Sequence, residues 1–162
     1  MKRMITLAAL LLVTISAFSQ NGKSIYKKYS EAESVSAVYI SPAMFRLIGK
    51  IPDLKVGEGE NVNLAPLIRS LSGLYIISSK NAAVNADLRA DAEKFVSGGR
   101  YELLMEAKDS GETVRMYTVG SEKVVEGFVM LALDGEETSF ICLDGKMNRD
   151  ELEDLLVETM KE

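Results

Sequence analysis

Histidine and tryptophan are absent from the 162-residue chain, and it contains a single cysteine, Cys142. Without histidine the chain cannot form a Ser-His-Asp triad, a Cys-His catalytic pair or the common zinc sites. A lone cysteine cannot form an intramolecular disulfide, so the stability of the fold must come from packing. An enzyme built from this chain would have to use carboxylates, Lys, Ser, Thr or Tyr.

Basic residues are in the minority: 19 Lys and Arg stand against 24 Asp and Glu, for a formal net charge of −5. Nucleic acid binding requires clustered basic side chains that neutralise phosphates, and the sequence has no such cluster. It also has no basic amphipathic helix that would bind anionic lipid. We therefore expect neither nucleic acid nor a lipid surface as a partner.

The N-terminus has the three-part pattern of a secretory signal. Residues 1–3 are basic, an apolar run follows to about Ala17, and the small residues Ala17 and Ser19 occupy positions −3 and −1 of a cut after Ser19. This order is typical of a cleavable signal peptide, and the run is short for a membrane span. A buried N-terminal helix or an uncleaved anchor are the alternatives. We expect a signal peptide over 1–19 and a single periplasmic or secreted domain over 20–162, with no membrane span after cleavage.

Apolar periodicity predicts the element order helix, strand, two helices, strand, helix, four strands, helix. Two strands joined through helices, followed by a meander, imply an α+β fold. We expect a mixed β-sheet of about six strands, with two helix-linked strands, then an antiparallel four-strand meander, and helices mainly on one face. Helices are predicted at 22–32, from Ser41 and Pro42 onward, near 64–71 and at 82–97. Strands are predicted at 35–40, which we expect to be central in the sheet, and at 74–77, 101–108, about 123–133 and about 138–143. A loop is expected at 57–61, and a final helix from Asn148 should bury Leu152, Leu155, Leu156 and Met160.

The strand that begins at Tyr101 alternates apolar and charged residues, and only Leu104 breaks the pattern. Ser110 and Gly111 suit a two-residue hairpin turn. That turn places Glu106 opposite Arg115, Met105 opposite Met116, and Ala107 opposite Val114. We expect the charged pair to face solvent and the two apolar pairs to lie inside.

Ser24 and Lys27 match the Ser-x-x-Lys pattern of serine acylases, in which the lysine helps to activate the serine. Neither a Ser-Asp-Asn nor a Lys-Thr-Gly partner motif accompanies the match. A chain with this content of Ser and Lys gives about one such match by chance, so a structural role is the favoured interpretation.

Residues 144–151 carry oxygen ligands at Asp144, Asn148, Asp150 and Glu151, faintly like a calcium loop. Basic residues interrupt the segment, and the glycine required at the sixth position is missing. The alternative is a turn followed by a helix that Asn148 caps, with acids favoured by the helix dipole.

Asp87, Asp91 and Glu93 on the predicted long helix could form a carboxylate pair for acid–base chemistry. Arg89 and Lys94 lie among them, and a solvated face of mixed charge explains all five residues.

Cys142 lies in an apolar strand, which favours a buried small side chain over a reactive thiol. Gly98, Gly99 and Arg100 offer donors for an anion but lack the order of a phosphate loop, so we interpret them as a helix stop.

Three segments carry a resemblance to a known family. They are residues 26–29, with the sequence Tyr-Lys-Lys-Tyr; residues 35–45; and residues 140–147, followed by Asp150, Glu151 and Leu152. Together they resemble the domain of unknown function 4252 family, exported proteins of Gram-negative bacteria, over nearly the whole mature chain. The resemblance implies a periplasmic α/β domain and supplies no catalytic residues.

No catalytic, cofactor-binding or metal-ligating residue is assigned from the sequence. The leading hypothesis is a non-catalytic binding or accessory module that contacts another periplasmic or envelope protein. Its contact surface would be an apolar strip on the meander, where residues 124–131 have no clear polar face; the alternative is that helices cover both sides. The competing hypothesis is a small-molecule-binding protein or histidine-free hydrolase with a cleft lined by several of Lys27, Tyr39, Tyr75, Asp87 and Arg100.

Overall fold

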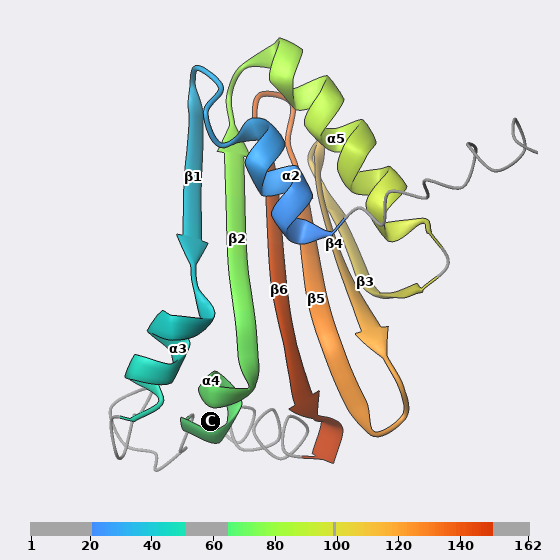
Figure 1. Ribbon diagram of the computed structural model, residues 1–162. Coiled ribbons are helices and arrows are strands. Elements are labelled where there is room, and N and C mark those ends of the chain that lie inside the picture. The colour runs from blue at the N-terminus through green and yellow to red at the C-terminus, as the bar shows by residue number, and fades with distance from the viewer. Residues whose placement is uncertain (1–20, 51–64, 99, 151–162) are drawn as a thin grey trace, which may run out of the picture.

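The computed structural model describes residues 21–50, 65–98 and 100–150, which form one six-stranded sheet and four helices (Figure 1). This is the α+β class predicted from the sequence. The loop expected at 57–61 and the side chains expected to anchor the final helix lie outside the described residues. In chain order the elements are α2 (Gly22–Tyr29), β1 (Val35–Ile40), α3 (Pro42–Ile48), α4 (Ala65–Ser70), β2 (Leu71–Ser79), α5 (Ala82–Val96), β3 (Tyr101–Asp109), β4 (Glu112–Gly120), β5 (Val124–Leu133) and β6 (Thr138–Asn148).

The strand order is β1-β2-β6-β5-β4-β3, and every neighbouring pair is antiparallel. The predicted meander is present as β3 to β6, but the sheet is not mixed. The crossover through α5 does make β2 and β3 run in the same direction, yet the meander folds back so that β6, β5 and β4 lie between them. The strand at 35–40 is also an edge strand rather than a central one, because only β2 pairs with it.

Two helices cover one face of the sheet. In Figure 1, α2 and α5 lie across the same side of the strands, whereas α3 and α4 lie at the end where β1 stops and β2 begins. Among the described residues, no helix is long and apolar enough to cross a membrane. The core between the helices and the sheet consists of Ile25, Tyr29, Leu88, Ala92, Phe95 and Val96 from the helices and Tyr75, Ile77, Val129, Leu131, Leu133, Phe140 and Cys142 from the strands.

Local sequence explains where the helices begin. Ser41 caps α3, as predicted, with its Oγ accepting from the Met44 backbone at 3.3 Å and Pro42 at the first helical position. Asn21 caps α2 in a capping box with Ser24, and Asn81 caps α5 through its Oδ1.

The hairpin of β3 and β4 has the predicted register: Glu106 pairs with Arg115 and Met105 with Met116. The turn works because Ser110 and Gly111 both adopt positive φ values, 47° and 97°. A β-bulge absorbs Leu104, the residue that breaks the alternation.

The faces of this hairpin, however, are the reverse of those predicted. The Arg115 guanidinium donates to Glu106 at 2.7 Å and to Glu93 on α5 at 3.2 Å, so the charged pair lies on the helix-covered face. Met105 lies on the opposite face and is 45% exposed. Alternation along a strand separates two faces but does not specify which face a distant helix covers.

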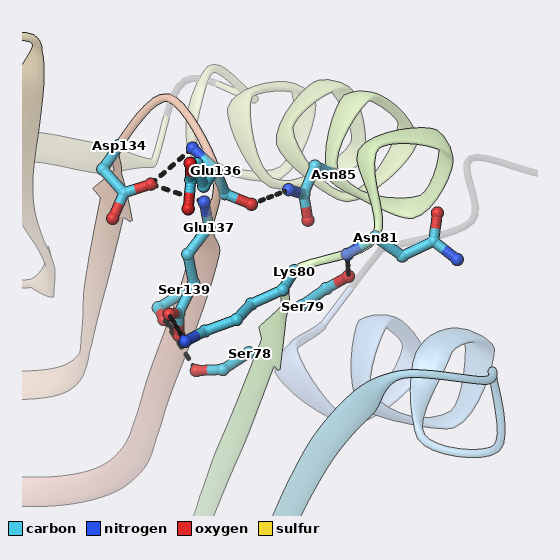
Figure 2. A network of polar contacts seen from close by, with 9 residues as sticks. All are labelled: Ser78, Ser79, Lys80, Asn81, Asn85, Asp134, Glu136, Glu137 and Ser139. Atoms are coloured by element: carbon cyan, nitrogen blue, oxygen red, sulfur yellow. Dashed lines mark hydrogen bonds and ion pairs between the residues drawn. The ribbon is translucent and has the colours of Figure 1, made fainter.

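Polar contacts join the β5–β6 turn to the start of α5 (Figure 2). The Asp134 carboxylate accepts from the Glu136 backbone at 2.6 Å, and Asn85 Nδ2 donates to the Glu136 carbonyl at 2.8 Å. Lys80 pairs with Glu137 at 3.6 Å. Asp134, Lys80 and Glu137 therefore each have a partner within the chain.

Candidate functional site

Ser24 and Lys27 form no catalytic arrangement in the structure. The Ser24 hydroxyl donates to the Asn21 carbonyl at 2.8 Å and accepts from the Asn21 backbone amide at 3.1 Å. Both Ser24 and Lys27 are exposed on α2. The serine of the Ser-x-x-Lys match belongs to the helix cap.

The three acids of α5 point to different partners. Asp91 accepts from Lys28 Nζ at 2.6 Å and from the Tyr29 hydroxyl at 2.7 Å, both on α2. Glu93 pairs with Arg89 and Arg115. Asp87 is exposed. Asp91 and Glu93 are thus occupied in ion pairs rather than combined with Asp87 in a carboxylate pair.

The segment compared with a calcium loop is strand through Asn148, because β6 extends five residues beyond the predicted end at 143. The predicted helix start is present, since Asn148 Oδ1 accepts from the Asp150 backbone at 3.0 Å. Glu151 lies outside the described residues. Over the described ranges, no group of three or more Cys, Asp or Glu side chains is placed to hold a metal ion.

The five residues proposed for a cleft do not line one together. Tyr39 and Tyr75 stack with ring centroids 5.2 Å apart, while Lys27 and Asp87 are exposed on α2 and α5. Arg100 lines a hollow that contains none of the other four. The helix that precedes Arg100 ends at Val96, with Ser97 as its C-cap, and Gly99 lies outside the described residues.

The face of the sheet opposite α2 and α5 is apolar across all six strands. We call it the open face, because no described helix crosses it (Figure 1). Alternation and register place on it Val38 and Ile40 of β1, Leu74 and Ile76 of β2, Ile141 and Leu143 of β6, Phe128, Met130 and Ala132 of β5, Val114 and Met116 of β4, and Met105 and Ala107 of β3.

None of these positions carries a charged side chain, and the same alternation and register place the polar residues Ser36, Ser78, Ser139 and Thr118 on the open face. Its acidic residues lie at the β3–β4 margin: Glu102, Asp109 and Glu112 are exposed. Val38 is 43% exposed, and most of the inner positions are half-buried by their neighbours on adjacent strands. Monomeric soluble proteins rarely expose apolar patches beyond a few hundred Å², so a surface of this composition is a candidate contact site.

A second feature lies on the helix-covered side, at the end of the sheet opposite the network in Figure 2. Register places Asp144 between two glycines, Gly73 on β2 and Gly127 on β5. Beside them is a hollow of about 310 Å³, which we call the Asp144 hollow. It is lined by Asn21, Ser72, Phe95, Arg100, Tyr101, Val119, Glu126, Asp144, Gly145 and Lys146.

Burial controls the titration of the groups around this hollow. Cys142 is fully buried, as predicted, and burial followed by the nearby Asp144 carboxylate raises the pKa of its thiol. Its Sγ donates to Asp144 Oδ1 at 3.5 Å. Burial also raises the pKa of the Asp144 carboxyl, although the Cys142 hydrogen bond opposes this. The thiol is therefore a weak donor to a poorly solvated acid.

The spacing of oxygen-bearing residues suggested Asp144 only as a member of a calcium-like loop, whereas the structure places it beside a hollow. A signal was present, because Phe140, Cys142 and Asp144 alternate on the same face of one strand. An acid in register with two buried apolar residues indicates a carboxylate that points toward the core side of the sheet. The predicted strand ends at residue 143, whereas β6 continues to Asn148, so Asp144 belongs to this alternation.

Comparison with known proteins gives one family. Neither the curated proteins nor the solved structures include a significant match. Residues 26–155, most of the chain, match the family model described as Domain of unknown function (DUF4252). The chain therefore belongs to the DUF4252 family.

Proposed function

We propose that the protein is a non-catalytic contact module that is exported by its signal peptide and binds another envelope protein through the open face. The observation that carries this proposal is the row of apolar side chains that extends from Val38 on β1 to Met105 on β3. Export is supported by the basic, apolar and small-residue order of residues 1–19.

Within the described residues, the main core cluster lies on the helix-covered side of the sheet. Phe140, Ile77 and Leu131 are fully buried on the helix-covered side, where α2 and α5 supply the second layer. Removing apolar surface from water is worth about 25 cal/mol per Å², so apolar side chains left half-buried retain a driving force for association. A partner surface can provide the missing layer.

The margin of the open face indicates the chemistry of the partner. Asp109 and Glu112 pair beside the β3–β4 turn, Glu102 lies at the opposite end of β3, and all three are exposed. Opposite charges at the margin of an interface orient the two proteins and accelerate association. We infer a partner with an apolar patch bordered by Lys or Arg side chains.

Site-specific photo-crosslinking in intact cells tests this function. A photoreactive phenylalanine analogue at Met130, in the middle of the open face, should give an adduct with one envelope protein. The matched control is the same analogue at Ala90, which is exposed on α5. The Met130 adduct should weaken when Glu102, Asp109 and Glu112 are replaced by lysine, because the charge complementarity reverses.

Three results would contradict the proposal. The first is the absence of any adduct from Met130, and the second is an identical adduct from Ala90. The third is an adduct composed only of two copies of this chain, which would assign the open face to self-association. Mass spectrometry of the exported protein checks the cleavage independently: its N-terminus should be Gln20.

A further inference from the structure

The Asp144 hollow lies on the helix-covered side, where Asp144 faces the end of α5 and the start of β3. Gly73 and Gly127 flank Asp144 on the two neighbouring strands; the Tyr75 ring lies over Gly73, and Val119 Cγ1 lies beside Gly127. The volume of about 310 Å³ falls at the lower end of the range for small-molecule pockets. An amino acid or a dipeptide is of suitable size for such a space.

The charged side chains of the hollow are unmatched. Arg100, Lys146, Glu126 and Asp144 all line it, and none of them forms an ion pair within the described part of the chain. At the opposite end of the sheet, Lys80 pairs with Glu137 and Asp134 accepts from backbone amides (Figure 2). Two unpaired charges of each sign around one concave surface indicate a ligand that carries both signs.

Asp144 has the strongest requirement for a partner. It is half-buried, and its hydrogen bond in the described region comes from the Cys142 thiol at 3.5 Å, a weak donor. Burial without a strong donor destabilises the ionised form and raises the pKa of this carboxyl. A bound ammonium group would supply hydrogen-bond donors and a positive charge. It would therefore stabilise the ionised form of the Asp144 carboxyl group.

The remaining wall is apolar. Phe95 and Tyr101 pack with ring centroids 5.0 Å apart, and Val119 lies beside them in the lining of the hollow. Aromatic faces bind both hydrocarbon groups and cations. The hollow thus combines an acid, two basic groups and an apolar surface.

We propose that the Asp144 hollow binds a small zwitterion with an apolar body, either a free amino acid or a short peptide. Asp144 receives the ammonium group, Arg100 and Lys146 receive the carboxylate, and Phe95 and Tyr101 contact the apolar side chain. This site is separate from the open face, so the two assignments can fail independently.

Titration of the ¹⁵N-labelled protein with small ligands, followed by NMR, tests the site. L-Leucine or the dipeptide Leu-Leu should produce saturable shifts at the amides of Tyr101, Gly127 and Gly145. N-acetyl-leucine lacks the ammonium group and leucinamide lacks the carboxylate, so each should bind about tenfold or more weakly, or about 1.4 kcal/mol. The relative affinities of leucine and Leu-Leu decide between a free amino acid and a peptide.

Two variants and a control assign the roles. Asp144→Asn keeps the side-chain shape and should weaken zwitterion binding by about tenfold, while leaving N-acetyl-leucine unaffected. Arg100 is exposed, and Arg100→Gln should weaken the binding of leucine but not the binding of leucinamide. Lys80→Gln, at the other end of the sheet, is the matched control and should change neither.

The assignment is overturned if no ligand of this set gives saturable shifts at the hollow. It is also overturned if N-acetyl-leucine binds as tightly as leucine, since the ammonium contact would then be unnecessary. A folded Asp144→Asn protein with unchanged leucine affinity would likewise contradict the role of the acid.

Discussion

Asp91 is the residue that joins the two covering helices through polar contacts. It accepts from Lys28 Nζ at 2.6 Å and from the Tyr29 hydroxyl at 2.7 Å. Burial disfavours the carboxylate, but these two hydrogen bonds outweigh burial and lower the pKa of Asp91. Burial, followed by the contact with Asp91, raises the pKa of Tyr29 to about 12, so its hydroxyl remains a donor at neutral pH.

Replacing Asp91 by asparagine should lower the free energy of unfolding by about 1 kcal/mol at pH 7, since the pair is partly exposed to solvent. The folded-state pKa of Asp91 lies below its unfolded value of about 3.9. Its contribution is therefore complete above that value and is lost as the pH falls through the folded-state pKa.

Urea unfolding at pH 7 and at strongly acidic pH measures this effect. The difference between the wild-type protein and Asp91→Asn should shrink at the acidic pH. Asp87→Asn, one turn earlier on the same helix and exposed, is the control and should change stability little at either pH. An equal loss for Asp91→Asn at both pH values would contradict the ion-pair interpretation.

At the scale of elements, α2 is held against β6 by a close approach of backbone to side chain. A Cβ atom on Gly22 would clash with Cys142 Sγ and would lie 2.8 Å from Cys142 Cβ. Cys142 is fully buried, so it has little room to move. The first turn of α2 therefore requires glycine for packing rather than for backbone conformation.

Gly22→Ala should destabilise the protein by about 1–3 kcal/mol through overpacking. In a Cys142→Ala background the same change should cost about 1 kcal/mol less, because the nearest clashing atom is removed. Thermal unfolding of the four proteins in the double-mutant cycle measures this coupling. Gly135→Ala is the control, since no heavy atom lies within 4 Å of a Cβ there. Additive effects at Gly22 and Cys142 would rule out the proposed contact.

Elements whose cause is local were predicted well from the sequence. The Ser41 cap and the register of Glu106 with Arg115 both depend on residues within about ten positions of each other, and both are confirmed. The mixed sheet expected from two helix-linked strands was wrong, because every neighbouring pair is antiparallel and β6 pairs with β2 across about 60 residues of chain. Pairing over that separation leaves no signal in local periodicity.

At the scale of the whole molecule, the sheet has one face packed under helices and one open face. Val129 and Met130 are adjacent on β5 but point to opposite sides. Val129 is 1% exposed and belongs to the core under α2 and α5. Met130 is half-buried among its neighbours on the open face.

Lysine at these two positions should have opposite consequences. Val129→Lys should destabilise the fold by about 3 kcal/mol or more, because it buries an unpaired charge. Met130→Lys should cost less than about 1 kcal/mol, since its ammonium group can reach water. Circular dichroism during thermal unfolding compares the two variants. Equal destabilisation would mean that the open face is covered in solution, and the proposed contact surface would fail with it.

The sequence by itself determined the chemistry that is unavailable and much of the local structure. The absence of histidine excludes whole classes of active site regardless of folding. Caps and turns follow from side chains and backbone preferences a few residues apart, which is why Ser41 and the pair Ser110 and Gly111 were identified correctly.

Only the tertiary structure decided which face of the sheet is covered and where the Asp144 hollow lies. The hollow is lined by residues such as Phe95, Tyr101 and Asp144, which come from α5, β3 and β6 and meet only in the folded chain. The open face depends on α2 and α5 both packing on the other side, with Glu93 contacting Arg115. Alternation within a strand divides side chains between two faces, but only contacts between distant segments distinguish the core from the surface.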